Sequence, residues 1–132
     1  MKKITSWILR LFAAGILLQT LGFKFTAHPD SVAIFESLGM EPHGRIIIGI
    51  LELVAGILLI VPSTVSYGAI LSWGVMSGAI IGHLTKIGIE GEHFSLFLLA
   101  IAVWISSAIL MVIHRDQIPI LRHMFEKSEK AT

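Results

Sequence analysis

A single carboxylate stands in the middle of a long apolar run in this 132-residue chain. Glu52 is the only charged residue between Arg45 and Pro62. A charge in such a run is costly in a membrane, and it usually faces the interior of a helix bundle where polar groups can reach it. Glu52 is therefore the first candidate for chemistry, as a group that binds a ligand or exchanges a proton.

Several polar groups are expected to meet Glu52 from neighbouring helices. Counted inward from the same side of the membrane, Gln19 reaches about the depth of Glu52 on an antiparallel helix. Lys24, Arg45 and His83 stand at the ends of apolar runs on that side, although about 10 Å of helix separates Arg45 from Glu52. The predicted polar pocket comprises Glu52, Gln19, Lys24, Arg45, His83 and Arg10.

Two interpretations of these residues remain open. In the first, they form a polar pocket that holds a small molecule; in the second, they form a buried network that only fixes how the helices pack. Arg10 lies fourteen residues before Lys24 and shares its helix face. For Arg10 the simpler expectation is that its long side chain reaches the nearer membrane interface.

Other kinds of chemistry find little support. The chain has no cysteine, so it carries no thiolate metal ligand and no dithiol of its own. The six histidines show no zinc-binding spacing, and no metal site is predicted. No nucleophile–base arrangement or glycine-rich phosphate loop is visible, so the catalytic residues, and whether the protein is an enzyme, stay unknown.

The elements that must position these residues are membrane spans. Hydrophobic residues make up 55% of the chain and charged residues only 14%, with a net charge of +1. Mean hydropathy is +0.83. About 20 apolar residues cross the hydrocarbon of a bilayer as a helix, and four runs approach that length: 4–25, 45–61, 65–84 and 94–113. We predict an all-α fold, a four-helix transmembrane bundle with antiparallel neighbours, forming one domain over residues 1–132.

The connections between the runs differ in length. Between the second and third runs, Pro62 to Thr64 predicts a tight helical hairpin. Within 26–44, apolar residues at helical spacing from Val32 to Leu38 predict a short amphipathic helix on the membrane surface or over the mouth of the bundle. The first run follows two lysines as a signal peptide would, but Arg10 interrupts it, so we expect it to remain as a span.

Positive charge near the spans predicts the orientation. Lys24, Arg45 and Lys86 flank one side of the membrane. The other side collects Lys2, Lys3, Arg10, Arg115, Arg122, Lys127 and Lys130. Seven against three predicts a cytoplasmic N-terminus and a cytoplasmic tail at 115–132. The external side would then carry His28, His43, His83 and His93.

Glycines recur at helical spacing in the second and third runs. Gly49 and Gly56 flank Glu52 at seven-residue spacing, and Gly74, Gly78 and Gly82 recur every four residues. Small residues arranged in this way let helix backbones approach closely. We expect both sets to pack helices within the bundle, and the stripe on the third run also offers a surface for a homo-oligomer.

Five features follow one another along the first three runs. They are an early arginine, Gly15, the stretch LGFKF at 21–25, the motif Gly49-x-x-Glu52-x-x-x-Gly56, and a histidine ending the third run. This order resembles the DoxX family over about residues 7–84. The positions that match the family's recurring ones are Arg10, Lys24, Glu52 and His83.

The resemblance implies a four-helix protein of the bacterial inner membrane associated with membrane redox systems. Relatives include a subunit of a thiosulfate:quinone oxidoreductase and a membrane anchor that assembles with oxidative-stress proteins. The first hypothesis is therefore a redox-associated subunit whose pocket around Glu52 binds a quinone or other small molecule. The alternatives are a non-catalytic anchor or assembly factor for a partner protein, and a small proton-linked carrier using Glu52. No nucleic-acid partner is expected.

Overall fold

The computed structural model describes residues 2–26, 29–41, 43–118, 123 and 126–130. Four long helices dominate it: α1 (Lys2–Phe25), α3 (His43–Ile60), α4 (Val65–Gly82) and α5 (Glu92–Ile113). Shorter elements connect or follow them: helix α2 (Pro29–Ser37), the 3-10 turns η1 (Pro62–Thr64) and η3 (Arg115–Gln117), and η2 (His83–Ile87), a single π-helical turn. Each long helix has the length and hydropathy to cross a membrane, and no strand occurs in these residues. The predicted all-α four-helix bundle is confirmed.

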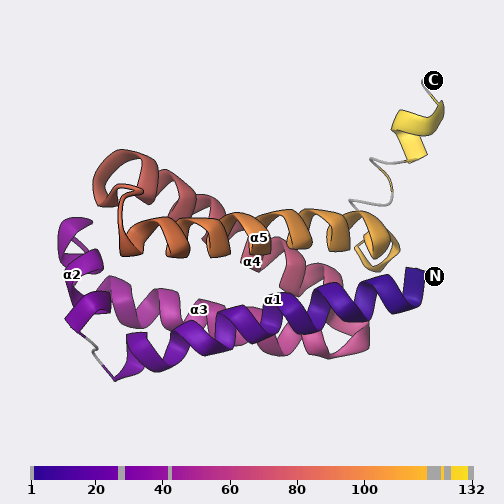
Figure 1. Ribbon diagram of the computed structural model, residues 1–132. Coiled ribbons are helices and arrows are strands. Elements are labelled where there is room, and N and C mark those ends of the chain that lie inside the picture. The colour runs from indigo at the N-terminus through magenta and orange to yellow at the C-terminus, as the bar shows by residue number, and fades with distance from the viewer. Residues whose placement is uncertain (1, 27–28, 42, 119–122, 124–125, 131–132) are drawn as a thin grey trace.

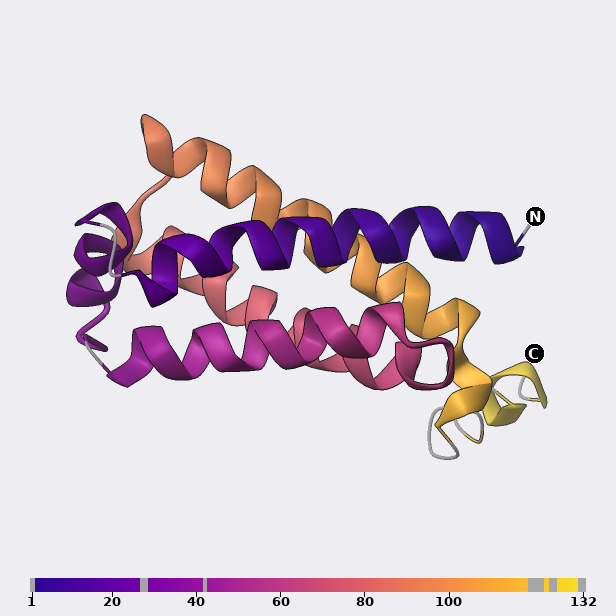
Figure 2. The same ribbon diagram turned by 90° about the horizontal axis from the view of Figure 1, so that it is seen from below.

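The long helices form a ring in which α1 packs on α3 and α5, and α4 also packs on α3 and α5. Figures 1 and 2 show that the start of α1 and the end of α5 lie at one end of the bundle, together with η1. We call this the terminal end. The opposite end, which we call the distal end, holds α2, the start of α3, and η2.

Three groups named in the prediction of orientation lie outside the residues that the structure describes. They are Arg122, His28 and the side chain of Lys2.

The amphipathic helix predicted in the first connection exists as α2. It contacts α1, α3 and η2, and its Phe35 side chain is buried. Leu38, just after the helix, packs close to Gly82 of α4: a Cβ added at Gly82 would meet its side chain at 3.3 Å. Helix α2 therefore packs over the distal end of the bundle, which is one of the two placements that the sequence allowed.

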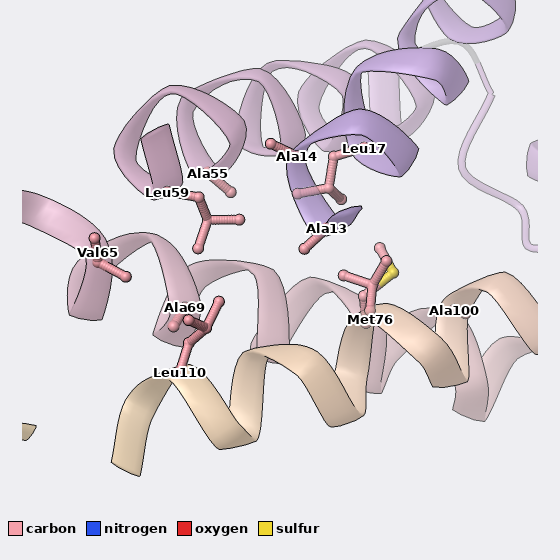
Figure 3. Packing of buried hydrophobic residues seen from close by; sticks show 11 residues of the cluster. Ala13, Ala14, Leu17, Ala55, Leu59, Val65, Ala69, Met76, Ala100 and Leu110 are labelled. Carbon is pink, nitrogen blue, oxygen red and sulfur yellow. The ribbon is translucent and has the colours of Figure 1, made fainter. Parts of the chain in front are cut away.

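Small and branched apolar side chains fill the centre of the ring (Figure 3). Leu17 from α1, Leu59 from α3, and Leu110 from α5 are fully or almost fully buried. Ser72 and Ser107 are also fully buried and bond each other across α4 and α5 at 2.5 Å. The Ser72 hydroxyl also bonds the carbonyl oxygen of Ala69 at 3.2 Å, so both hydroxyls have partners within the bundle, which is the usual role of polar residues between membrane helices. The cluster comprises Ala13, Ala14, Leu17, Ala55, Leu59, Val65, Ala69, Met76, Ala100, Val103 and Leu110.

The two glycine sets have different surroundings. A Cβ at Gly49 would meet Phe25 at 2.8 Å and one at Gly56 would meet Leu18 at 3.3 Å, so this face of α3 packs closely on α1 as expected. The stripe on α4 was predicted to pack within the bundle, and this is wrong for Gly74 and Gly78. Both are exposed, and a Cβ added at either position would have no atom within 4 Å. That face of α4 therefore points away from α3 and α5.

The glycine that brings α3 and α4 together is Gly68, which the spacing argument did not single out. A Cβ there would lie 2.8 Å from the backbone nitrogen of Leu59 and 3.0 Å from the carbonyl oxygen of Ala55. Backbone atoms cannot rotate away as a side chain can. Residue 68 therefore has to be glycine for the α3–α4 hairpin to close.

We expect Gly68→Ala to destabilise the protein by about 1–3 kcal/mol, the usual effect of overpacking a core. Gly78→Ala is the matched control on the same helix, and it should be neutral or slightly stabilising because alanine favours helix more than glycine does. Unfolding of both variants in detergent checks the pair. Equal stability of the two variants would contradict the close contact at Gly68.

Candidate functional site

Glu52 lies near the middle of α3 and is buried, with 3% of its surface exposed. Its Oε2 atom lies 3.0 Å from the Lys24 ammonium of α1, and the Thr20 hydroxyl donates to the same atom at 3.1 Å. Lys24 stands in the last turn of α1, so its side chain extends inward along the bundle to reach the carboxylate. Thr20 and Lys24 are four residues apart and share one face of α1. The carboxylate is therefore held between two groups of one helix.

Arg45 continues this polar chain toward the distal end. It is buried, and its guanidinium bonds both carboxylate oxygens of Glu41 at 2.9 and 3.1 Å. It also donates to the backbone carbonyl of Lys24. Arg45 thus joins the first turn of α3 to the last turn of α1, and the connected groups run from the bundle end to the middle of a span. We call them the Lys24 network: Glu41, Arg45, Lys24, Glu52 and Thr20.

Gln19 was expected beside Glu52 and is not there. Its side chain is exposed, because the face of α1 that turns toward α3 carries Leu17 and Thr20 instead. The neighbouring residue Thr20, at a similar depth, makes the bond to Glu52 instead. Counting residues from an interface gives the depth of a side chain. It does not give the rotation of the helix about its axis, which decides whether Gln19 or Thr20 faces α3.

Arg10 lies apart from the Lys24 network and bonds the end of α3. It is buried, with 3% of its surface exposed, and it donates to the carbonyl oxygens of Leu59 and Ile60 at 2.6 and 2.5 Å. Its guanidinium also lies 3.7 Å from the centre of the Trp7 ring. The last carbonyls of a helix have no partner within the helix, and Arg10 supplies one at the end of α3, near the terminal end.

His83 also lies apart from the Lys24 network. Its ring Nδ1 bonds the carbonyl oxygen of Ala79 at 2.8 Å, and its ring lies 5.8 Å from that of Phe97. It lines a cavity of about 410 Å³ at the distal end. The other lining residues come from η2 and the turn after it: Leu84, Ile87, Gly88, Ile89, Glu90 and His93.

A second hollow, of about 400 Å³, lies along α4 and α5 and is almost entirely apolar. Ser77 and Trp104 line it and bond each other, with the indole nitrogen donating at 2.8 Å. Among the residues that the structure places, no group of three or more histidine, aspartate or glutamate side chains is arranged to hold a metal. Neither hollow is lined by a residue of the Lys24 network.

Some residues of these sites were not predicted, although their spacing in the sequence could have identified them. Glu41 precedes Arg45 by four residues, and Thr20 precedes Lys24 by four, the spacing at which helical side chains interact. His114 was also overlooked. It stands just after α5, where its ring bonds the Ser6 hydroxyl at 2.6 Å and its carbonyl accepts a bond from Ser66. These contacts join three helices at the terminal end.

The pKa of His114 lies below its usual value of 6.5, first because partial burial disfavours the charged ring and second because Arg10 repels it. The unfolded chain therefore binds more protons than the folded protein just below pH 6.5. We expect stability to fall as the pH drops through this window toward the lowered pKa, and His114 to contribute no slope well above it. Thermal unfolding of wild type and His114→Gln from about pH 5 to pH 8 checks this.

The His114→Gln variant should show a flatter pH profile in that window, and His43→Gln is the control because His43 is exposed at the distal end. An unchanged slope in His114→Gln would contradict the assignment.

Four spanning helices with buried polar side chains between them define a multi-pass α-helical membrane protein. The sequence profile of the DoxX-like family matches residues 8–105, about three quarters of the chain, and the protein belongs to that family. The match covers the Lys24 network, His83 and most of α5. Comparison with curated proteins gives no significant match, and comparison with solved structures gives none either.

Proposed function

We propose that this protein is a redox-associated membrane subunit that binds a quinone or another small carbonyl-bearing molecule at the Lys24 network. The observation that carries the proposal is the Lys24–Glu52 ion pair, in which a buried carboxylate near the middle of a span meets an ammonium. An ammonium has three donors, so Lys24 can hold Glu52 and still donate to the oxygen of a guest. Its side chain keeps 13% of its surface exposed, which leaves a way to approach it.

Glu52 supports the same proposal because the ion pair can move protons: the Lys24 ammonium can give a proton to a reduced guest, and the Glu52 carboxylate can accept one. The chain has no cysteine, so electrons would have to come from a partner protein or from the bound molecule itself. The protein would therefore serve as the membrane component of a larger redox system, with the polar centre as its binding site.

The experiment measures binding of decyl-ubiquinone to the protein in lipid nanodiscs. Lys24→Gln should weaken binding by about tenfold or more, as expected when a charged hydrogen-bond donor is removed. Glu52→Gln should keep the fold and also weaken binding. The control is Lys86→Gln, which removes an exposed lysine from the same end. Equal binding by all four proteins, or no binding by wild type, would overturn the proposal.

The second candidate is a non-catalytic anchor or assembly factor. It is favoured by the exposed face of α4, where Gly74 and Gly78 leave space for another helix to approach. That helix would belong to a second copy of this chain or to a partner. Gly82 is excluded from this surface because it is buried against Leu38. Cross-linking in native membranes, with Gly78→Leu as the variant that blocks the face, tests this candidate.

We also propose a bacterial inner-membrane location with the terminal end in the cytoplasm. Of the ten basic residues, Lys24, Arg45 and Lys86 flank the spans on one side in the sequence, and the other seven flank them on the side of the two termini. The Lys24 network and the His83 cavity would then open toward the outside of the cell. Reporter fusions after Gln117 and within 85–93 should report the cytoplasm and the outside respectively, and the reverse result would contradict the orientation.

A further inference from the structure

The cavity at the distal end contains two ring nitrogens that lack partners. The Nε2 atom of His83 and the Nδ1 atom of His93 are both buried, and neither has a hydrogen-bond partner in the described part of the chain. Both side chains line the same cavity of about 410 Å³. Leaving a buried polar atom unpaired costs about 1–3 kcal/mol. The two residues that carry these atoms line one cavity, which a bound molecule able to complete their hydrogen bonding would fill.

The bond to Ala79 determines what His83 can offer. A carbonyl oxygen only accepts, so the Nδ1 atom of His83 must carry the hydrogen in the bond to Ala79. In the neutral ring the Nε2 atom then holds a lone pair and accepts. The bound molecule must therefore present a donor to His83, such as a hydroxyl group.

The remaining lining restricts the molecule further. Leu84, Ile87 and Ile89 provide apolar walls, and Phe97 lies against the His83 ring. Glu90 contributes a carboxylate to the lining, which disfavours anions such as phosphates and carboxylates. The volume lies near the lower end of the range for ligand pockets, about 300–1,000 Å³, so it suits a small ring compound.

The local backbone is also unusual where the cavity forms. His83 begins the π-helical turn η2, and the turn that follows contains Gly88 and Gly91 with positive φ angles of 88° and 61°. π-Helical turns occur frequently at functional sites because they rotate side chains out of the regular helical register. Here the irregular segment bends the chain between α4 and α5, so that His83 and His93 line one cavity.

We propose that this cavity binds a small, neutral, hydroxylated aromatic compound, with its hydroxyl donating to His83 and its ring against the apolar walls. His93 bonds a second polar atom of the ligand or the same hydroxyl oxygen. The site uses none of the side chains of the Lys24 network. Ligand binding in this cavity is therefore independent of whether a quinone binds at the Lys24 network.

The test compares p-cresol with its methyl ether, which has the same ring but no hydrogen to donate. Binding to the full chain in lipid nanodiscs is followed by saturation-transfer NMR. p-Cresol should bind, and the ether should bind about tenfold more weakly or not at all. In protein labelled with nitrogen-15 histidine, the His83 Nε2 resonance should shift on addition of p-cresol but not of the ether.

His83→Phe keeps an aromatic ring in the wall and removes the acceptor, so it should weaken binding of p-cresol by about tenfold. His43→Phe, on an exposed histidine of the same end, should bind as wild type does. Equal binding of the two compounds, or a zinc-induced shift of both histidines with no response to p-cresol, would overturn the proposal. The labelled wild-type experiment decides the question even if His83→Phe does not fold.

Discussion

Replacing Lys24 by methionine is expected to destabilise the protein by about 3–5 kcal/mol, the usual cost of leaving one member of a buried ion pair without its partner. Glu52 is buried and has Lys24 at 3.0 Å as its cationic partner. Methionine preserves most of the length and apolar contact of the lysine stem but supplies no charge. The measurement is unfolding of the purified protein in detergent, compared with wild type.

A double variant separates the ion pair from the general effect of changing Lys24. Lys24→Met combined with Glu52→Gln removes both charges and leaves the amide able to bond Thr20, so it should regain most of the lost stability. Lys86→Met is the control for loss of an exposed lysine at the same end, and it should change stability by less than about 0.5 kcal/mol. If Lys24→Met alone behaves like Lys86→Met, the ion pair contributes nothing to the fold.

The same variants bear on the two interpretations of the network. A purely structural pair predicts that the double variant is stable and retains whatever the wild type binds. A binding site predicts that the double variant is stable but has lost its ligand. Stability and binding must therefore be measured on the same preparations, because a loss of binding in an unstable protein says little about the site.

The spans and their number could be predicted from sequence because they depend on properties of continuous segments. A helix that crosses the hydrocarbon needs a long apolar run, and α1, α3, α4 and α5 each show one. The inward direction of Glu52 followed from Gly49 and Gly56, which flank it on one face of α3 and pack on Phe25 and Leu18. Both inferences use only the helical period and the cost of burying charge.

The identity of the partners could not be predicted in the same way, because it depends on how each helix is rotated about its axis. Gln19 and Thr20 differ by about 100° around α1, so depth alone cannot tell which of the two faces α3. The same uncertainty misplaced Gly74 and Gly78, whose spacing is regular whether the face points inward or outward. His83 was assigned to the Glu52 pocket because it stands at the same end of the bundle as Lys24 and Arg45. Position along the bundle does not determine which neighbouring side chain it meets.

The hydrogen-bond partners of Arg10 could not be predicted from the sequence either. An arginine early in a span is expected to extend toward the nearer interface, and nothing in the sequence of α1 indicates otherwise. The structure shows that the hairpin at Pro62 leaves the carbonyls of Leu59 and Ile60 within reach of the guanidinium. The last carbonyls of a helix have no partner within that helix, so those at the end of α3 need a donor from elsewhere. The donor comes from a residue about 50 positions away.

The second large effect is therefore expected at Arg10. Arg10→Met should destabilise the protein by about 2–4 kcal/mol, since hydrogen bonds from a charged donor contribute about 1.5–3 kcal/mol and two carbonyls lose theirs. Arg10→Lys should recover only part of this, because an ammonium lacks the planar fork that reaches two acceptors at once. Lys3→Met, an exposed change on the same helix, is the control. Hydrogen exchange adds a local readout: the amide of Thr64, bonded to Val61 at 3.1 Å, should exchange faster in Arg10→Met. A variant as stable as Lys3→Met, with unchanged exchange at Thr64, would show that Arg10 does not hold the α3–α4 hairpin closed.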